Sequence, residues 1–168
     1  TPLPYLLGQW EFFGLSFKIT PDVLIPRPET ELLVEKALSK LSVRSNDFSR
    51  SSEKATEVAT TNQTIVDVGT GSGIVAVTLA AKLPHANIIA ADISAAALEV
   101  ARANAVAHGV ADRVKFIHGD LLEGVGKVNL ICANLPYIPT AELATLPVAK
   151  HEPTLALDGG PDGLRLRS

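Results

Sequence analysis

The sequence predicts an α/β protein with a doubly wound, mostly parallel sheet, and three observations lead to this prediction. From residue 65 onward, apolar segments rich in Ile, Val and Ala alternate with helical segments. Strands of this composition are buried on both faces, and a helix between two such strands makes them parallel through a right-handed crossover. Gly-rich or polar residues also follow four of the strands, where sheets of this kind bind ligands.

The elements follow one another in a regular order. The predicted strands of the sheet span 65–68, 87–92 and 113–120, and a fourth within 128–137 runs into a loop. The predicted helices between the strands span 72–83 and 95–109. Ahead of them, residues 10–19 are aromatic and β-branched around a glycine, which favours a short hairpin. Prolines between 21 and 28 then keep the chain extended, and the helix predicted after them starts with Glu29 and Glu31, which suit its positive end.

The length of 168 residues and a hydrophobic share of 46% fit one compact domain. Residues 42–64 are rich in Ser, Thr and charge, so the sequence predicts a polar, flexible linker there, with a phosphorylated or partner-binding loop as the alternative. This linker separates residues 1–41, predicted as the hairpin and first helix of the catalytic domain, from residues 65–168, predicted as its ligand-binding core.

Composition narrows the classes of protein further. A net charge of -3 provides no global basic field for a nucleic-acid backbone. The single cysteine, Cys132, excludes an intramolecular disulfide, and four scattered histidines give no zinc template, so we expect an intracellular protein without a metal. No apolar run approaches the roughly 20 residues of a membrane helix. The lack of any Met and the start at Thr1 favour a piece of a longer protein.

The first strand of the sheet ends in Gly69, Thr70, Gly71, Ser72 and Gly73, directly before a helix. Glycines here let the backbone approach a ligand, and the first N–H groups of the helix remain free to bind it. A tight strand-to-helix turn is the alternative. The third glycine comes one residue earlier than in the dinucleotide pattern, which favours a nucleoside ligand without a pyrophosphate.

Carboxylates end the next two strands. Asp92 lies 23 residues after Gly69, where a carboxylate can accept hydrogen bonds from both hydroxyls of a ribose. The alternative role, capping the following helix, suits Ser94 better. Asp120 could accept a hydrogen bond from an adenine amino group, with Leu121 lining the ring, although an aspartate in a simple turn is equally compatible with this position.

The fourth strand leads into Asn134, Leu135, Pro136 and Tyr137. Pro136 stiffens the backbone, Asn134 offers an amide side chain, and Tyr137 supplies a flat face. Such a corner suits a planar nitrogen that donates one hydrogen to the Asn134 side-chain oxygen and one to the Leu135 carbonyl. Losing both bonds would leave buried donors unpaired, which is costly.

Together with this tetrad and the glycine-rich turn, the stretch LIPRPETELLVE at 24–35 resembles the HemK-type, or PrmC-type, protein-(glutamine N5) methyltransferases. The resemblance covers nearly the whole chain except 42–64, and it implies a Rossmann-like class I fold that uses S-adenosylmethionine to methylate the Gly-Gly-Gln glutamine of peptide chain release factors. It further implies a cytoplasmic protein, or an organellar one in a eukaryote, with a release factor as partner and no direct contact with nucleic acid or membrane.

The resemblance also implies roles for the residues at the strand ends. Gly69 to Gly73 would line the methionine part of the cofactor, Asp92 would hold its ribose, Asp120 and Leu121 would border its adenine, and Asn134 to Tyr137 would hold the substrate glutamine, with Asn134 also beside the cofactor. The segment 151–164 is similar to the one that follows the catalytic loop of the family. Direct methyl transfer to a poorly nucleophilic amide depends mainly on positioning, and Cys132 is interpreted as a buried strand residue.

Two departures from the family pattern are present. Leu135 stands where the family usually has proline, which keeps the backbone carbonyl, so catalysis should survive. Family members also carry a helical domain ahead of the region 5–18 and three more strands after Gly163, and we therefore expect this chain to be incomplete at both ends.

Three other functions remain open at this stage. An adenine N6 or cytosine N4 methyltransferase uses a similar tetrad on a flipped base but needs a basic groove. A nucleotide-binding oxidoreductase domain would not need the residues 134–137, and its glycine spacing differs. The third alternative is a fragment that binds S-adenosylmethionine weakly or not at all, with its fourth strand left as an exposed apolar edge.

Overall fold

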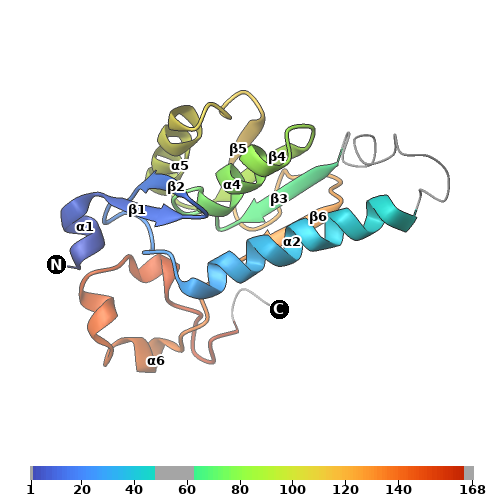
Figure 1. The fold of residues 1–168 in the computed structure, drawn as a ribbon. Helices are drawn as coiled ribbons and strands as arrows, with labels where there is room; N and C mark the ends of the chain where they lie inside the picture. Colours follow the sequence, from blue (N-terminus) through green and yellow to red (C-terminus); the bar gives the residue numbers. More distant parts are fainter. Residues whose placement is uncertain (1, 48–62, 165–168) are drawn as a thin grey trace.

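The computed structural model describes residues 2–47 and 63–164 (Figure 1). Its centre is a four-stranded sheet in the order β5-β4-β3-β6, in which every pair of neighbours is parallel. The strands are β3 (Thr64–Val68), β4 (Asn87–Asp92), β5 (Val114–His118) and β6 (Leu130–Ala133). The chain builds the sheet outward from β3 in one direction and then returns to place β6 on its other side. The order therefore reverses between β3 and β6, where such sheets bind ligands beyond their carboxyl ends.

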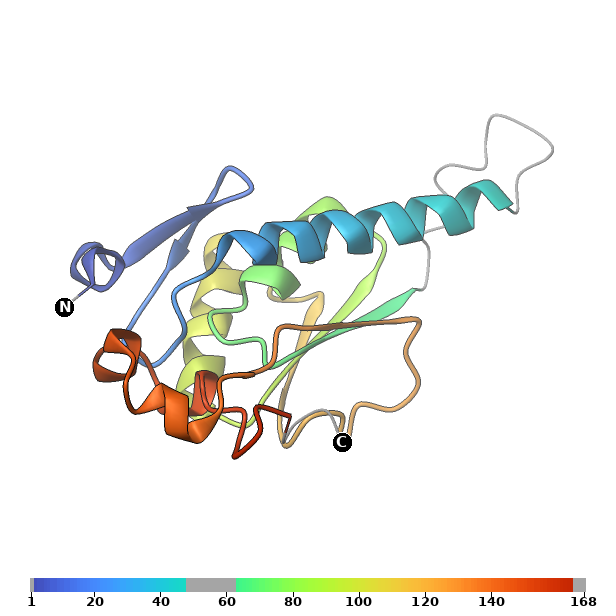
Figure 2. The ribbon, with the colours of Figure 1, turned by 90° about the horizontal axis from the view of Figure 1, so that it is seen from below.

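The longer helices gather on one face of this sheet (Figure 2). They are α2 (Pro28–Asp47), α4 (Ile74–Lys82) and α5 (Ala95–Ala107), and all three contribute buried side chains to the cluster that packs against the strands. Helix α4 is almost wholly buried because Ile, Val, Leu and Ala dominate it. None of the described helices is long and apolar enough to cross a membrane.

The other face of the sheet is covered by a connecting segment rather than by the longer helices. In the described part of the chain, Val66 and Ile89 on this face pack with Val125 from the connection 119–129 between β5 and β6. This connection contains three glycines and forms turns rather than a helix. β6 is an edge strand, and its Ile131 is 50% exposed.

The predicted hairpin is confirmed as β1 (Gln9–Phe12) paired antiparallel with β2 (Leu15–Lys18). Its two turn residues, Phe13 and Gly14, both have positive φ, as hairpin turns of two residues require. A short helix precedes it, α1 (Leu3–Leu7), which the two prolines of the opening residues had not suggested.

Helix α2 runs six residues further than the sequence predicted. It ends at Asp47, inside the segment 42–64 expected to be a linker, and Thr64 already belongs to β3. No Gly or Pro occurs between residues 42 and 47, and polar composition alone does not end a helix. The remainder of the predicted linker, 48–62, lies outside the described residues.

The described C-terminal part, 134–164, folds back over the carboxyl ends of the strands. It contains α6 (Thr140–Leu143), η1 (Pro147–Lys150) and η2 (Thr154–Ala156), and a single bridge joins Ile138 to Asp158. Gly159 and Gly163 pack against the backbone of Tyr137 so closely that a side chain at either would collide with it. These glycines hold the returning segment against the end of β6.

Helix α4 contains one polar group without a partner. The side chain of Thr78 is fully buried, and its hydroxyl makes no hydrogen bond. We expect Thr78→Val to raise the free energy of unfolding by about 1 kcal/mol, because it removes an unsatisfied hydroxyl and keeps the side-chain shape. Urea denaturation checks this prediction, with Thr78→Ala, which also leaves a small cavity, expected to be less stable than Thr78→Val. A Val variant less stable than the native chain would contradict it.

Candidate functional site

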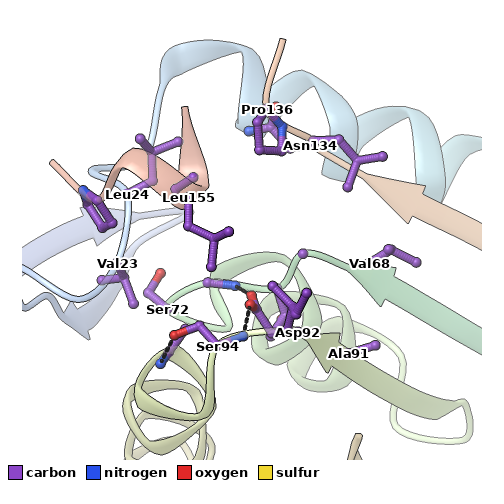
Figure 3. A pocket seen from close by; sticks show the side chains of 18 of the residues that line it. Val23, Leu24, Val68, Ser72, Ala91, Asp92, Ser94, Asn134, Pro136 and Leu155 are labelled. Carbon is purple, nitrogen blue, oxygen red and sulfur yellow. Dashed lines mark hydrogen bonds between the residues drawn. The ribbon is translucent and has the colours of Figure 1, made fainter. Parts of the chain in front are cut away.

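A cavity of about 670 Å³ opens at the carboxyl ends of β3, β4 and β6. Segments 21–26 and 153–158 complete its walls (Figure 3). Ten of the twelve residues predicted from the sequence line it: Gly69, Thr70, Gly71, Ser72, Asp92, Asp120, Leu121, Asn134, Leu135 and Pro136. Gly73 and Tyr137 do not. The volume lies within the usual range for small-molecule and cofactor sites.

The glycine-rich turn forms the floor of this cavity. The N–H groups of Gly69 and Thr70 both donate to the carbonyl of Ala91, at 2.9 and 3.0 Å, which fixes the turn to the end of β4. Gly69 and Gly71 have positive φ values of 69° and 55°, which favour glycine. The turn therefore presents backbone rather than side chains to a ligand.

Gly73 has a different place from the other glycines of the turn. It caps the start of α4 with a φ of 78°, and a Cβ on it would lie 2.8 Å from the Cβ of Ala101 in α5. Its absence from the cavity wall follows from this packing. Gly73 therefore allows α4 and α5 to pack closely against each other.

Asp92 holds the turn from the side of β4. One carboxylate oxygen accepts a hydrogen bond from Gly71 N at 2.8 Å, and the other accepts one from Ser94 N at 2.9 Å (Figure 3). Ser94 caps α5 by accepting a bond from Ala97 N at 3.2 Å, which confirms that Ser94 rather than Asp92 is the N-cap of this helix. Each Asp92 oxygen keeps a second lone pair with which it can accept a hydrogen from a ligand.

Asp67, which the sequence analysis did not single out, is buried beneath the turn at 3% exposure. Thr70 Oγ1 donates to its carboxylate at 2.6 Å and Ala76 N donates at 3.3 Å. Burial raises the pKa of Asp67 from 3.8 to about 7; the two hydrogen bonds act against this rise, and the Asp92 carboxylate adds a little to it.

This raised pKa predicts a pH dependence of stability. Between about pH 4 and 7 the folded chain binds a proton at Asp67 more tightly than the unfolded chain does, so this group lowers the free energy of unfolding as the pH rises through that window. We expect Asp67→Asn to remove this fall in the free energy of unfolding with rising pH, which amounts to at most about 4 kcal/mol. Denaturant unfolding at pH 5 and pH 8 compares the two chains, and equal pH slopes would contradict the prediction.

The corner after β6 is held by a residue from α2. Asn134 Nδ2 donates to Thr30 Oγ1 at 3.3 Å, and Thr30 is only 4% exposed. The side chain of Leu135 packs with the apolar cluster that includes Val68, which accounts for a leucine at this position. Tyr137 is 60% exposed and lies off the cavity wall.

Several supporting residues were missed at the sequence level. Glu152 is 7% exposed and accepts bonds from Ile25 N at 3.0 Å and from the Arg27 guanidinium at 2.7 Å. Asn104 is 1% exposed; it bonds to Ser72 O at 2.8 Å and to both backbone groups of the hairpin residue Lys18. The sequence signals for Arg27 and Glu152 were the resemblances at 24–35 and 151–164, which assigned no role to either residue.

The charge of the lining is one-sided. Among the residues that the structure describes, it includes five aspartates, Asp22, Asp67, Asp92, Asp120 and Asp158, and no Lys, Arg or His. Within residues 2–47 and 63–164, no group of three or more His, Cys, Asp or Glu side chains is placed to hold a metal ion. Cys132 is buried in β6 as expected, and burial, with a contribution from Asp67, raises the pKa of its thiol to about 12.

Comparison with known proteins agrees with this architecture. Residues 52–150 match the family described as Methyltransferase small domain. A protein named Release factor glutamine methyltransferase from Moorella thermoacetica is 48% identical over 166 residues, which are 97% of this chain and 53% of that protein. A protein of the same name from Chlorobaculum tepidum is 45% identical, covering 93% of this chain and 52% of that protein. The chain thus spans about half the length of these curated relatives.

Solved structures show the same fold at low identity. The N-terminal domain of human METTL16 is 22% identical, with a TM-score of 0.56 over 74% of this chain and 47% of that chain. The same domain in complex with SAH is 21% identical, with a TM-score of 0.55 over 76% of this chain and 49% of that chain. The architecture is that of the Rossmann-like class I methyltransferases. By its sequence, the chain belongs to the methyltransferase small domain family.

Proposed function

We propose that the chain binds S-adenosylmethionine and methylates the side-chain nitrogen of the glutamine in the Gly-Gly-Gln motif of a peptide chain release factor. One observation carries this proposal: the Asn134 carboxamide lines the cavity while Thr30 holds its nitrogen end. The names of the relatives from Moorella thermoacetica and Chlorobaculum tepidum support the choice of substrate. Release factors act where translation terminates, so we also propose a cytoplasmic location, or an organellar one in a eukaryote.

The cavity suits S-adenosylmethionine in shape and charge. Gly69 and Gly71 leave space for its methionine part beside the backbone, and a Cβ on Gly69 would come within 3.4 Å of Leu135. Asp92 can accept bonds from the ribose hydroxyls, while Asp120 and Leu121 lie where an adenine would be bordered. The sulfonium and ammonium groups are cations, and the five lining aspartates attract them. When bound, this cofactor supplies an electrophilic methyl group.

The residues after β6 would hold the substrate amide. Asn134 Oδ1 and the Leu135 carbonyl each accept one hydrogen of the planar glutamine nitrogen, and Pro136 keeps the corner rigid. Both acceptors become more favourable as positive charge develops on that nitrogen, so they stabilise the transition state more than the ground state. No nucleophilic side chain is needed for this step.

A nucleic-acid substrate is disfavoured by the lining. Phosphate backbones are held by Lys and Arg, and neither residue type lines the cavity in the described part of the chain. The lining favours instead an uncharged group such as the amide of a glutamine side chain.

The experiment incubates the chain with S-adenosylmethionine and a release factor, and maps the methyl group by mass spectrometry. We expect one added methyl on the Gly-Gly-Gln glutamine, and none on a release factor in which that glutamine is replaced by glutamate. Methylation of an adenine or cytosine oligonucleotide but not of the release factor would overturn the proposed substrate. Calorimetric binding of NAD in preference to S-adenosylmethionine would overturn the proposed cofactor.

A further inference from the structure

Two residues of the PRPETE motif (residues 26–31), Pro26 and Thr30, line the cavity although the motif belongs to none of the strand ends. Its start is anchored by the Arg27 guanidinium, which bonds to the Glu152 carboxylate at 2.7 Å, and the preceding Ile25 N–H bonds to the same carboxylate at 3.0 Å. Glu152 is 7% exposed, whereas the Arg27 side chain is 38% exposed, so the carboxylate is the buried half of this anchor. The motif is thereby fixed to the wall formed by 152–156.

From this anchor the chain enters α2, where Thr30 is the third residue. The helix starts at Pro28, whose ring fixes its φ angle, and the Thr30 N–H donates a hydrogen bond to Arg27 O at 3.0 Å. Farther along, α2 buries Val34 and Ala37 in the main core. The Thr30 side chain therefore stands on a rigid element rather than on a loop.

In this structure the Thr30 hydroxyl is the acceptor for the Asn134 side chain, whose nitrogen end therefore faces α2. A carboxamide has a donor end and an acceptor end, and Nδ2 of Asn134 is turned to Thr30 Oγ1 at 3.3 Å. Its Oδ1 consequently points away from α2. Because Asn134 lines the cavity, this oxygen is the atom left to accept a hydrogen there.

We infer that Thr30 is a positioning residue that holds the Asn134 carboxamide in the orientation needed for methyl transfer. This inference rests on the proposed function, in which Asn134 Oδ1 accepts a hydrogen from the substrate amide. Without the Thr30 hydroxyl, the carboxamide can rotate by 180° about its χ2 bond. The Asn134 NH₂ group would then face the NH₂ group of the substrate amide, and both are hydrogen-bond donors. The effect acts on the orientation of the bound amide, not on the binding of S-adenosylmethionine.

Three variants test this inference on the full chain. Thr30→Val removes the hydroxyl and keeps the shape, whereas Thr30→Ser keeps the hydroxyl; if Thr30→Val does not fold, Thr30→Ala replaces it. We expect Thr30→Val to lower kcat by about tenfold, the value of one hydrogen bond, while KM, the Kd for S-adenosylmethionine and Tm stay close to those of the native chain. Thr30→Ser should restore most of kcat. The matched control is Thr78→Val, the same change at a buried threonine outside the cavity wall, which should leave kcat unchanged.

A second readout needs no substrate. In ¹H–¹⁵N spectra the side-chain amide of Asn134, assigned by its loss in Asn134→Asp, should shift and exchange faster with water in Thr30→Val but not in Thr30→Ser. An unchanged Asn134 signal or an unchanged kcat in Thr30→Val would overturn the inference. Loss of kcat in parallel with Tm or cofactor binding, or in Thr30→Ser as much as in Thr30→Val, would do the same. If the native chain does not methylate a release factor, the proposed function fails, and the spectra still decide whether Thr30 orients Asn134.

Discussion

Replacing Asn134 by alanine should lower kcat for methylation of a release factor by about 10²- to 10³-fold, while the Kd for S-adenosylmethionine changes by no more than a few fold. The reason is that Asn134 Oδ1 is expected to stabilise the substrate nitrogen as charge develops on it, and removal of one such group at other active sites has an effect of this size. In the proposed complex the turn 69–72 and Asp92 hold the cofactor, and this change leaves them in place.

Steady-state kinetics and calorimetry on the same preparations check this prediction. Asn87→Ala is the matched control, because Asn87 is exposed at the amino end of β4, whereas the cavity lies at the carboxyl end of this strand. The control should retain the native kcat. Full activity of Asn134→Ala would show that the corner does not present the substrate amide.

Replacing Asp92 by asparagine should weaken the binding of S-adenosylmethionine by about 10²-fold, since hydrogen bonds to a charged group contribute about 1.5–3 kcal/mol each. Both oxygens of Asp92 already accept backbone bonds, from Gly71 N and from Ser94 N. An asparagine amide can satisfy only one of these two donors, whichever way it is turned. The substitution therefore disturbs the glycine-rich turn in addition to removing an acceptor for the ribose.

Calorimetric titration with S-adenosylmethionine measures this effect directly. Asp112→Asn changes the same charge at an exposed residue that does not line the cavity, and it should bind the cofactor as the native chain does. An Asp92→Asn chain with native affinity would mean that the ribose is held elsewhere.

The strand ends could be predicted from sequence because local patterns define them. Continuous apolar runs give the strands, and the residue at which each run stops is visible in the sequence. Position in a parallel sheet then brings Gly69, Asp92 and Asn134 to one edge, although they are far apart along the chain. The hairpin was predictable for the same reason, since its turn and its aromatic residues are adjacent.

The residues that support the site could not be found in this way. Thr30 and Asn134 are 104 positions apart, and Arg27 and Glu152 are 125 apart. Neither pair has a local pattern, because the contacts depend on how α2 and the returning segment pack. Asp67 was missed because an acidic residue within an apolar strand shows its burial and its hydrogen bond from Thr70 only after folding.

Sequence also failed at boundaries that are decided by tertiary packing. The polar residues 42–47 continue α2 although their composition suggested a linker. The strand predicted over 113–120 is shorter in the structure, where β5 spans Val114–His118. In each case the local composition was compatible with two structures.

A crystal structure of the chain with S-adenosylhomocysteine, the product cofactor, tests the central claim most directly. We expect the ribose hydroxyls on Asp92, the adenine beside Leu121, and the sulfur facing the corner formed by Asn134 and Leu135. A complex in which the sulfur points away from that corner, or in which the adenine occupies it, would contradict the assignment of the cavity.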